Sequence, residues 1–237
     1  MSNKYFRFKQ FIVYQEKAAM KVGIDSVLLG AWADFDNAKR ILDIGTGTGL
    51  LSLMAAQKSL AQITAIEIDE DSIKQAQENI NLSIWSERIK IVNSSFQDFA
   101  KQKDLKYDCA ICNPPYFNGT YQSPNQQRNK ARHNNTLPLP DLFAGLNRIL
   151  APNGKLYIIY PYFQKDDLIS EAYKYNFYPN KILEIKPHKN KPAKRIAICF
   201  SQKNIPSNIT QLFIKDAITM QYSKEYINLT KSFYLDF

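Results

Sequence analysis

Short apolar runs alternate with amphipathic stretches along most of this chain. Five apolar runs of strand length lie at residues 40–44, 63–67, 89–92, 107–112 and 155–160. Apolar side chains also recur with helical spacing, at residues 50–58, 71–80, 142–150 and 164–176. Alternation of this kind predicts an α/β fold with a mostly parallel sheet and helices on both of its faces.

The two ends of the chain extend this pattern. Residues 27–33 predict a helix ahead of the first strand, and a further helix is predicted near residues 210–221. Apolar runs at residues 182–185 and 195–200 predict two more strands, which makes a seven-stranded sheet with a final antiparallel strand. The last six residues are mostly apolar, so we expect the tail to pack on the rest of the domain.

The composition is that of a globular protein with a full core. The chain has 237 residues, of which 45% are hydrophobic and 22% charged, and this length favours a single domain. We see no apolar run near the roughly 18 residues that a membrane helix needs. The first residues lack the apolar stretch of a signal peptide, so we expect a cytoplasmic protein without a membrane partner.

The three cysteines do not predict a disulfide framework or a metal site. Cys109 and Cys112 have CxxC spacing, but no second pair accompanies them. Both lie inside a predicted strand, where residues three apart face opposite sides of the sheet. We therefore predict ordinary buried thiols and no bound metal.

Four polar residues follow or end consecutive predicted strands: Asp43, Glu67, Ser95 and Asn113. Parallel sheets bind their ligands at the carboxyl ends of the strands. We therefore expect these four side chains to meet at one edge of the sheet.

A glycine loop follows the first of these strands. Gly45, Gly47 and Gly49 alternate with other residues, and glycine lets a ligand approach the backbone closely. A nicotinamide fingerprint needs G-x-G-x-x-G, and Leu50 takes the place of its last glycine. The loop is instead similar to the one that holds the methionine part of S-adenosylmethionine. A tight turn without a ligand is the alternative.

The other strand ends fit the rest of that cofactor. Glu67 is placed to accept hydrogen bonds from the two ribose hydroxyls, and Asp43 to shape the loop and reach the amino group. Phe96 is expected to pack on the adenine ring and Ser95 to bond its edge, although Phe96 could instead be a core aromatic.

The tetrapeptide Asn-Pro-Pro-Tyr at residues 113–116 carries the expected chemistry. The side-chain carbonyl of Asn113 and the backbone carbonyl of Pro114 offer two acceptors for the hydrogens of a planar amino group, and the prolines stiffen both. Preset dipoles of this kind contribute several kcal/mol to a transition state. Tyr116 offers a stacking face for a planar base. We predict methyl transfer to a nitrogen.

At this point the chain resembles the bacterial tRNA(Val) adenine-N6 methyltransferases. The likeness rests on the glycine loop, the Asn-Pro-Pro-Tyr motif and the stretches 20–32, 76–81 and 128–133. It implies a Rossmann-like class I methyltransferase fold, S-adenosylmethionine as cofactor and the adenosine 3′ of the anticodon as target. It also implies cofactor or substrate contacts for Gly45, Glu67, Phe96 and Asn113. Relatives often have Asp where Ser95 stands, so Asp98 is an alternative contact for the adenine amine.

The resemblance also predicts how one domain, residues 1–237, is organised. Residues 1–39 form an extension over the cofactor site, residues 40–201 the catalytic core and residues 202–237 a tail packed on it. A protein-glutamine methyltransferase is the nearest alternative, but such enzymes usually carry a separate helical domain ahead of the first strand. A non-catalytic RNA-binding protein with this fold is a second alternative.

The charge of the chain favours a nucleic acid as the partner. Lys and Arg number 31 against 22 Asp and Glu, a net charge of +9. Basic residues gather in two loops, and the candidates for phosphate contact are Arg128, Lys130 and Arg132 in one and Lys189, Lys191 and Lys194 in the other. Either group could instead be a solvated surface. The oligomeric state is left open.

Overall fold

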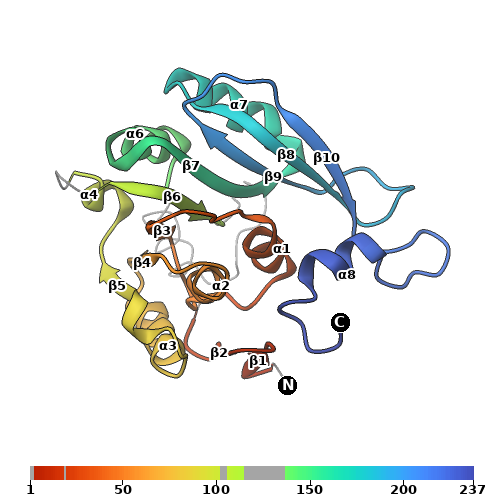
Figure 1. Cartoon of the computed structure of the whole chain (residues 1–237), viewed down its shortest axis with the longest axis horizontal. Helices are drawn as coiled ribbons and strands as arrows, with labels where there is room; N and C mark the ends of the chain where they lie inside the picture. Colours follow the sequence, from red (N-terminus) through yellow and green to blue (C-terminus); the bar gives the residue numbers. More distant parts are fainter. Residues whose placement is uncertain (1–2, 19, 102–105, 115–136) are drawn as a thin grey trace, which may run out of the picture.

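A mixed sheet runs through the centre of the molecule (Figure 1). The computed structural model describes residues 3–18, 20–101, 106–114 and 137–237. In that part of the chain the sheet has eight strands in the order β10-β8-β9-β7-β6-β3-β4-β5. Their bounds are β3 (Arg40–Ile44), β4 (Gln62–Glu67), β5 (Ile89–Asn93), β6 (Tyr107–Cys112), β7 (Leu150–Pro161), β8 (Tyr178–Lys186), β9 (Arg195–Ser201) and β10 (Asn208–Phe213). Only β9 runs antiparallel to its neighbours.

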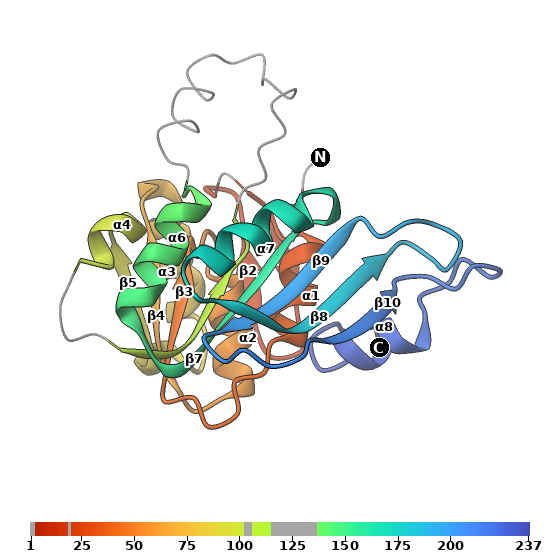
Figure 2. The ribbon, with the colours of Figure 1, turned by 90° about the horizontal axis from the view of Figure 1, so that it is seen from above.

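Helices cover both faces of the sheet, as the alternating pattern predicts (Figures 1 and 2). One face carries α1 (Ile24–Trp32), α2 (Leu50–Lys58) and α3 (Glu70–Asn81). The other carries α4 (Phe96–Phe99), α6 (Leu139–Ile149) and α7 (Lys165–Lys174). Short 3-10 turns lie at Ser86–Arg88 and Tyr162–Gln164.

Side chains of each central strand alternate between two cores because successive strand residues face opposite sides. In β3, Ile41 belongs to the core under α1 and α2, and Leu42 to the core under α6 and α7. Cys109 and Cys112 divide in the same way, which confirms the predicted buried thiols on opposite faces. Burial raises the pKa of Cys109 to about 12, so this thiol stays protonated and unreactive near neutral pH.

The seven predicted strands are all present, but the predicted helix near residues 210–221 is wrong. Residues 208–213 form β10, which pairs in parallel with β8 and adds an eighth strand. Ile209 and Thr210 are β-branched and favour a strand, and the open edge of β8 supplies the backbone partners. The tail's helix begins later, as α8 (Lys224–Thr230).

Two helices begin earlier than the sequence indicates. The predicted helix at residues 27–33 starts at Ile24, directly after Gly23. The helix expected to open at Asp71 starts at Glu70, because Asp69 is the N-cap and its carboxylate accepts a hydrogen bond from the Ser72 N–H at 2.8 Å.

An amino-terminal hairpin, β1 (Tyr5–Arg7) and β2 (Ile12–Tyr14), lies against the tail and against α3. The Lys9 N–H donates to the Phe233 carbonyl at 2.8 Å, and its ammonium donates to the carbonyls of Lys231 at 2.7 Å and Phe237 at 2.5 Å. Phe233 is 1% exposed, in the same core as α1 and α2. The first and last parts of the chain therefore form one layer.

Candidate active site

The ends of β3, β4, β5 and β6 lie side by side at one edge of the sheet. Ile44 pairs with Ile66 of β4 and with Cys112 of β6, and Glu67 pairs with Asn93 of β5. Asp43, Glu67, Ser95 and Asn113 therefore follow or end four neighbouring strands. The predicted convergence of these residues at one edge is confirmed.

The glycine loop between β3 and α2 leaves room for a ligand. Gly45 and Gly47 have φ angles of 70° and 54°, in the left-handed region that favours glycine. A Cβ atom built on either residue meets no atom within 4 Å, so the space beside both is open. A Cβ on Gly49 would instead lie 3.5 Å from Ala76, so this third glycine lies close to α3.

Glu67 is locked by three backbone donors. One carboxylate oxygen accepts from the Gly47 N–H at 2.9 Å, and the other from the N–H groups of Ile68 at 2.8 Å and Asp69 at 3.1 Å. These bonds fix the carboxylate beside the glycine loop. One lone pair remains, on the oxygen that accepts from Gly47, and it suits a ribose hydroxyl.

Asp43 is fully buried beneath the same loop. Its Oδ2 accepts from the hydroxyls of Thr46 at 2.6 Å and Ser52 at 2.7 Å. Its Oδ1 is also buried and has no hydrogen-bond partner among the described residues. Desolvation, opposed by the two hydroxyl bonds and aided by the nearby Glu67 charge, raises the pKa of this carboxyl from 3.8 to about 6. A buried acceptor without a donor is costly, so the site suits a cationic ligand such as an ammonium or sulfonium group.

The turn after β5 caps a short helix. Ser95 is the N-cap of α4, where its hydroxyl accepts from the Asp98 N–H at 3.1 Å and donates to the Asp98 carboxylate at 2.8 Å. Asp98 is exposed, and its bond to Lys101 lowers its pKa. The two alternative contacts for the adenine amine thus belong to one hydrogen-bonded turn.

Phe96 is 5% exposed and belongs to the core under α6. A Cβ built on Gly145 of α6 would lie 2.4 Å from its ring, so the ring is packed directly on that helix. This placement is that of a core aromatic, with little of the ring open to a ligand. Its contact with adenine stays a prediction.

Asn113, directly after β6, is bonded to α1. Its side-chain Nδ2 donates to the hydroxyl of Ser26 at 2.7 Å, which orients the amide. Pro114 follows and is half-buried, whereas Tyr116 lies outside the described residues. Ser26 lies in the stretch 20–32 that supports the family resemblance, but no local pattern indicates its role.

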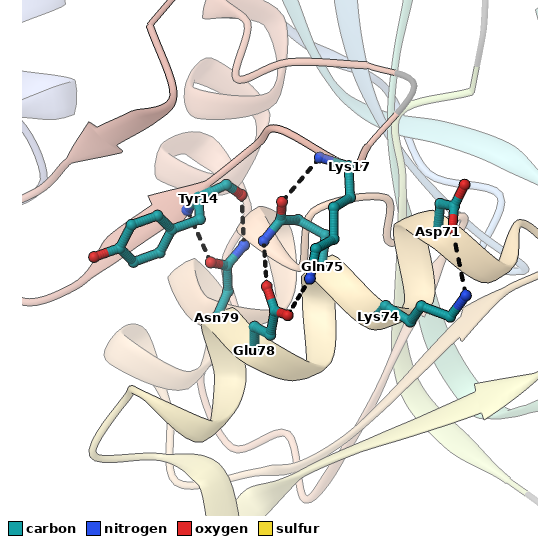
Figure 3. Close-up of polar contacts among 7 residues, drawn as sticks. All are labelled: Tyr14, Lys17, Asp71, Lys74, Gln75, Glu78 and Asn79. Carbon is teal, nitrogen blue, oxygen red and sulfur yellow. Dashed lines mark hydrogen bonds and ion pairs between the residues drawn. The ribbon is translucent and has the colours of Figure 1, made fainter.

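A second polar network joins the amino-terminal segment to the glycine loop (Figure 3). The side chain of Asn79 on α3 accepts from the Tyr14 N–H at 2.8 Å and donates to the Tyr14 carbonyl at 2.9 Å. It also donates to the Thr48 carbonyl of the glycine loop at 2.8 Å. One turn earlier, Gln75 accepts from the Lys17 N–H at 3.1 Å. Asn79 and Gln75 are each 1% exposed, so residues 14–17 are fixed to the helix that follows β4.

The loop between β8 and β9 lies at the same edge of the sheet, because β8 runs parallel to β6 and β7. Lys189, Lys191 and Lys194 are exposed on it. The root of the loop is fixed, since Arg195 Nε donates to Asp25 of α1 at 2.7 Å. The other three basic candidates, Arg128, Lys130 and Arg132, lie outside the described residues.

The polar groups at this edge fit S-adenosylmethionine. Glu67 and the open glycine loop would hold the ribose and the methionine part, and the buried carboxyl of Asp43 beneath the loop would balance its positive charge. Among the described residues, no three His, Cys, Asp or Glu side chains are grouped to hold a metal ion. No helix in that part of the chain is long and apolar enough to cross a membrane.

Comparisons with known proteins identify the family of the chain. Residues 35–217 match the family described as Methyltransferase domain. The chain is 41% identical to a tRNA1(Val) (adenine(37)-N6)-methyltransferase from Parabacteroides distasonis over 235 residues, with 99% of each chain covered. It is 40% identical to a protein of the same name from Flavobacterium psychrophilum, covering 97% of this chain and 99% of that one.

The chain belongs to the tRNA1(Val) (adenine(37)-N6)-methyltransferase family. The predicted family and the predicted methyltransferase class are thereby confirmed, and with them S-adenosylmethionine as cofactor. The relatives align with this chain over nearly its whole length, including the hairpin and the tail.

Solved structures support the fold. The crystal structure of a predicted O-methyltransferase from Agrobacterium tumefaciens has a TM-score of 0.69 at 20% identity, covering 88% of this chain and 96% of that one. A ribosomal protein L11 methylase from Lactobacillus delbrueckii subsp. bulgaricus has a TM-score of 0.55 at 20% identity, covering 76% and 78%. At this identity the likeness shows the Rossmann-like methyltransferase fold alone.

Proposed function

We propose that this protein methylates the exocyclic N6 of adenosine 37 in tRNA1(Val), in the cytoplasm. The observation that carries the proposal is the bond between Asn113 and Ser26, which presents an oriented amide beside the cofactor edge. The relatives' activity, read from their names, supplies the substrate. A glutamine side chain is also planar, but the exposed lysines of the β8–β9 loop favour an RNA.

The residues at the strand ends divide the work between cofactor and substrate. S-adenosylmethionine, when bound, supplies an electrophilic methyl group. Glu67 and the glycine loop hold it, and Asp43 stabilises its positive charge. Because the methyl group is already reactive, alignment contributes most of the remaining rate.

Asn113 and Pro114 act on the amino group of the base. Their carbonyl oxygens accept hydrogen bonds from the two N6 hydrogens and draw the nitrogen lone pair out of conjugation with the ring. The lone pair would then form the new N–C bond to the supplied methyl group, whose bond to sulfur breaks to leave S-adenosylhomocysteine, and one N6 hydrogen would leave as a proton to solvent. Tyr116, by the sequence prediction, stacks on the base. An anticodon loop favours this geometry because its bases are already unpaired.

Methylation of transcripts tests the proposal directly. Purified protein, S-adenosylmethionine and a tRNA1(Val) transcript should give one N6-methyladenosine per molecule, measured by mass spectrometry of the nucleosides. A transcript with guanosine at position 37 is the matched control and should give none. Equal methylation of both transcripts, or methylation of a protein instead, would contradict the assigned target.

A further inference from the structure

A small cavity lies beside the first turn of α1, at the same edge of the sheet as the active site. Its volume is about 190 Å³, and its apolar lining consists of Ile24, Ile185, Pro187 and Ile214. An apolar cavity of about 150 Å³ is enough for one benzene ring, whereas drug-sized ligands need roughly 300 Å³ or more. The cavity therefore fits one flat ring system of modest size.

The polar side of the cavity is cationic. Lys194, Arg195 and Asp25 complete the lining, which amounts to two positive charges and one negative charge. Asp25 is bonded to Arg195 at 2.7 Å, so the charge of Arg195 balances that of the acid and Lys194 supplies the net positive charge. Lys194 is exposed at the rim. Apolar walls with a cation at the rim match the two parts of a nucleotide, a base face and a phosphate.

Backbone hydrogen bonds hold the walls of the cavity together. The Lys194 N–H donates to the Ile185 carbonyl at 2.9 Å, and the Ile214 N–H donates to the Lys186 carbonyl at 2.9 Å. The third segment, the first turn of α1, is fixed by the bond between Asp25 and Arg195. The cavity is thus formed by paired backbone and does not depend on side-chain packing alone.

The position of the cavity relative to Asn113 is set by the sheet. Asn113 follows β6, and Arg195 begins β9, two strands away across β7, or about 10 Å at the usual strand spacing. The apolar lining lies beyond it, with Ile185 in β8 and Ile214 after β10, or about 15 and 20 Å from β6. Helix α1 spans the nearer gap, because consecutive residues Asp25 and Ser26 bond Arg195 and Asn113. A nucleotide adjoining one held at Asn113 reaches the cavity with its base splayed away from the target base, as bases in RNA loops are.

We propose that this cavity binds the base of a nucleotide next to the methylated adenosine, with Lys194 at its rim holding the adjoining phosphate. The inference rests on the proposed function, since it takes an RNA loop as the substrate. It assigns α1 and the β8–β10 end of the sheet to recognition of the sequence around the target. Burial of one base against these aliphatic walls should change the affinity about ten-fold.

Binding measured with paired protein and RNA changes tests the cavity. The ligands are the anticodon stem-loop of tRNA1(Val) and two versions with an abasic nucleotide, one at position 36 and one at position 38. Ile24→Ser and Ile214→Ser should each weaken binding of the intact loop about ten-fold. Ile209→Ser is the matched control, because Ile209 is 61% exposed on β10 and does not line the cavity.

The decisive result is the coupling between the protein substitution and the loss of the base from the RNA. If one flanking base occupies the cavity, the Ile24→Ser protein should bind the corresponding abasic loop no worse than the wild type does. Lys194→Ala should weaken intact and abasic loops equally, because it removes a phosphate contact. Additive losses for both abasic positions, or no loss with Ile24→Ser, would overturn the inference. Melting temperature and S-adenosylhomocysteine binding, each near wild type, exclude misfolding.

Methylation in the same samples separates this inference from the proposed function. Binding without N6-methyladenosine in the wild type would refute the proposed function, while the coupling would still decide the cavity. Methylation without coupling would refute the cavity alone. No binding of the stem-loop would overturn both.

Discussion

The sheet edge that carries the active site has two sides, and they are built in opposite ways. On the β3–β4 side, two hydrogen-bonded carboxylates hold the structure: half-buried Glu67 accepts from three backbone N–H groups, and buried Asp43 accepts from two hydroxyls. On the β8–β9 side, backbone bonds and one ion pair hold the loop, and its lysines extend into solvent. The β3–β4 side holds its carboxylates in fixed positions. The β8–β9 side carries exposed lysine side chains on a loop whose root is fixed.

This difference matches two kinds of ligand. A small cofactor needs groups placed before it arrives, because alignment determines the rate of transfer. An RNA backbone presents a regular row of charges, which mobile lysines follow without exact placement. The first side should therefore respond strongly to single substitutions, and the second weakly and in proportion to the number of charges removed.

The largest effect is expected at Asn113, where the two sides meet. Asn113→Ala should lower the single-turnover rate about 10²- to 10³-fold, the usual cost of losing a preset acceptor. Its melting temperature should stay within a few degrees of the wild type, because the residue is only half-buried. Ser26→Ala keeps the amide and loses its orientation, so a drop of about ten-fold is expected. A rate near wild type for Asn113→Ala would refute the mechanism.

Asp43→Asn should separate binding from stability. The raised pKa means that the folded protein binds more protons than the unfolded chain between pH 3.8 and about 6. Stability from this group therefore falls as the pH rises through that window, by about 3 kcal/mol at 1.36 kcal/mol for each pH unit. Above pH 6 the ionised carboxyl remains a cost that asparagine removes.

We expect Asp43→Asn to raise the free energy of unfolding at pH 7.5 and to change it little at pH 4. Urea titrations at both pH values, without cofactor, measure this difference. Cofactor affinity should fall about ten-fold or more, since the negative charge beneath the loop is lost. A variant less stable than the wild type at pH 7.5 would show that Asp43 is a structural residue.

Asn79→Ala tests the network that joins the hairpin to the glycine loop. It leaves the buried carbonyl of Thr48 and the partly buried backbone groups of Tyr14 without their partner, so a loss of about 2 kcal/mol in unfolding free energy is expected. Amide hydrogen exchange in residues 5–14 should also become faster. Gln77→Ala, on the exposed side of the same helix, should stay within about 0.5 kcal/mol of the wild type. Equal effects of the two variants would argue against the network.

The smallest effect is expected in the basic loop. Replacing Lys189, Lys191 and Lys194 with alanine should reduce the salt slope of tRNA binding by about two units, at roughly 0.7 for each single-strand phosphate contact. Cofactor binding should not change. The exposed lysines Lys90, Lys106 and Lys203 provide a control triple with the same loss of charge. An unchanged slope would remove this loop from the docking surface and leave the other predicted basic group, Arg128, Lys130 and Arg132, as the main candidate.

Most of the fold could be predicted because its signals are local. Buried strands of a parallel sheet are continuous apolar runs, so β3 and β6 are found residue for residue. Strand β10 was missed because its first four residues are exposed and it depends on pairing with β8. The hairpin of β1 and β2 was missed for a similar reason, since its partners are α3 and the distant tail.

The same distinction between local signals and distant partners holds for the residues of the site. Asp43, Glu67 and Asn113 could be predicted because topology brings strand ends together whatever the details of packing. Ser26 and Asn79 could not, because their partners are 87 and 31 residues away in the chain. Such bonds depend on the packing of helices and leave no periodic pattern. The contacts of Tyr116 and of the 128–132 cations stay predictions.

The contact between the hairpin and the tail has a consequence for synthesis. The hairpin is synthesised well before residues 231–237, which hold Lys9. Domains fold as units during translation, and contacts this far apart in the chain close late. Because the hairpin also holds Asn79, which bonds the glycine loop, a nascent chain should acquire full cofactor affinity only after residues 231–237 have emerged. Ribosome-bound chains stalled near residue 220 should then contain the central sheet without a finished binding site.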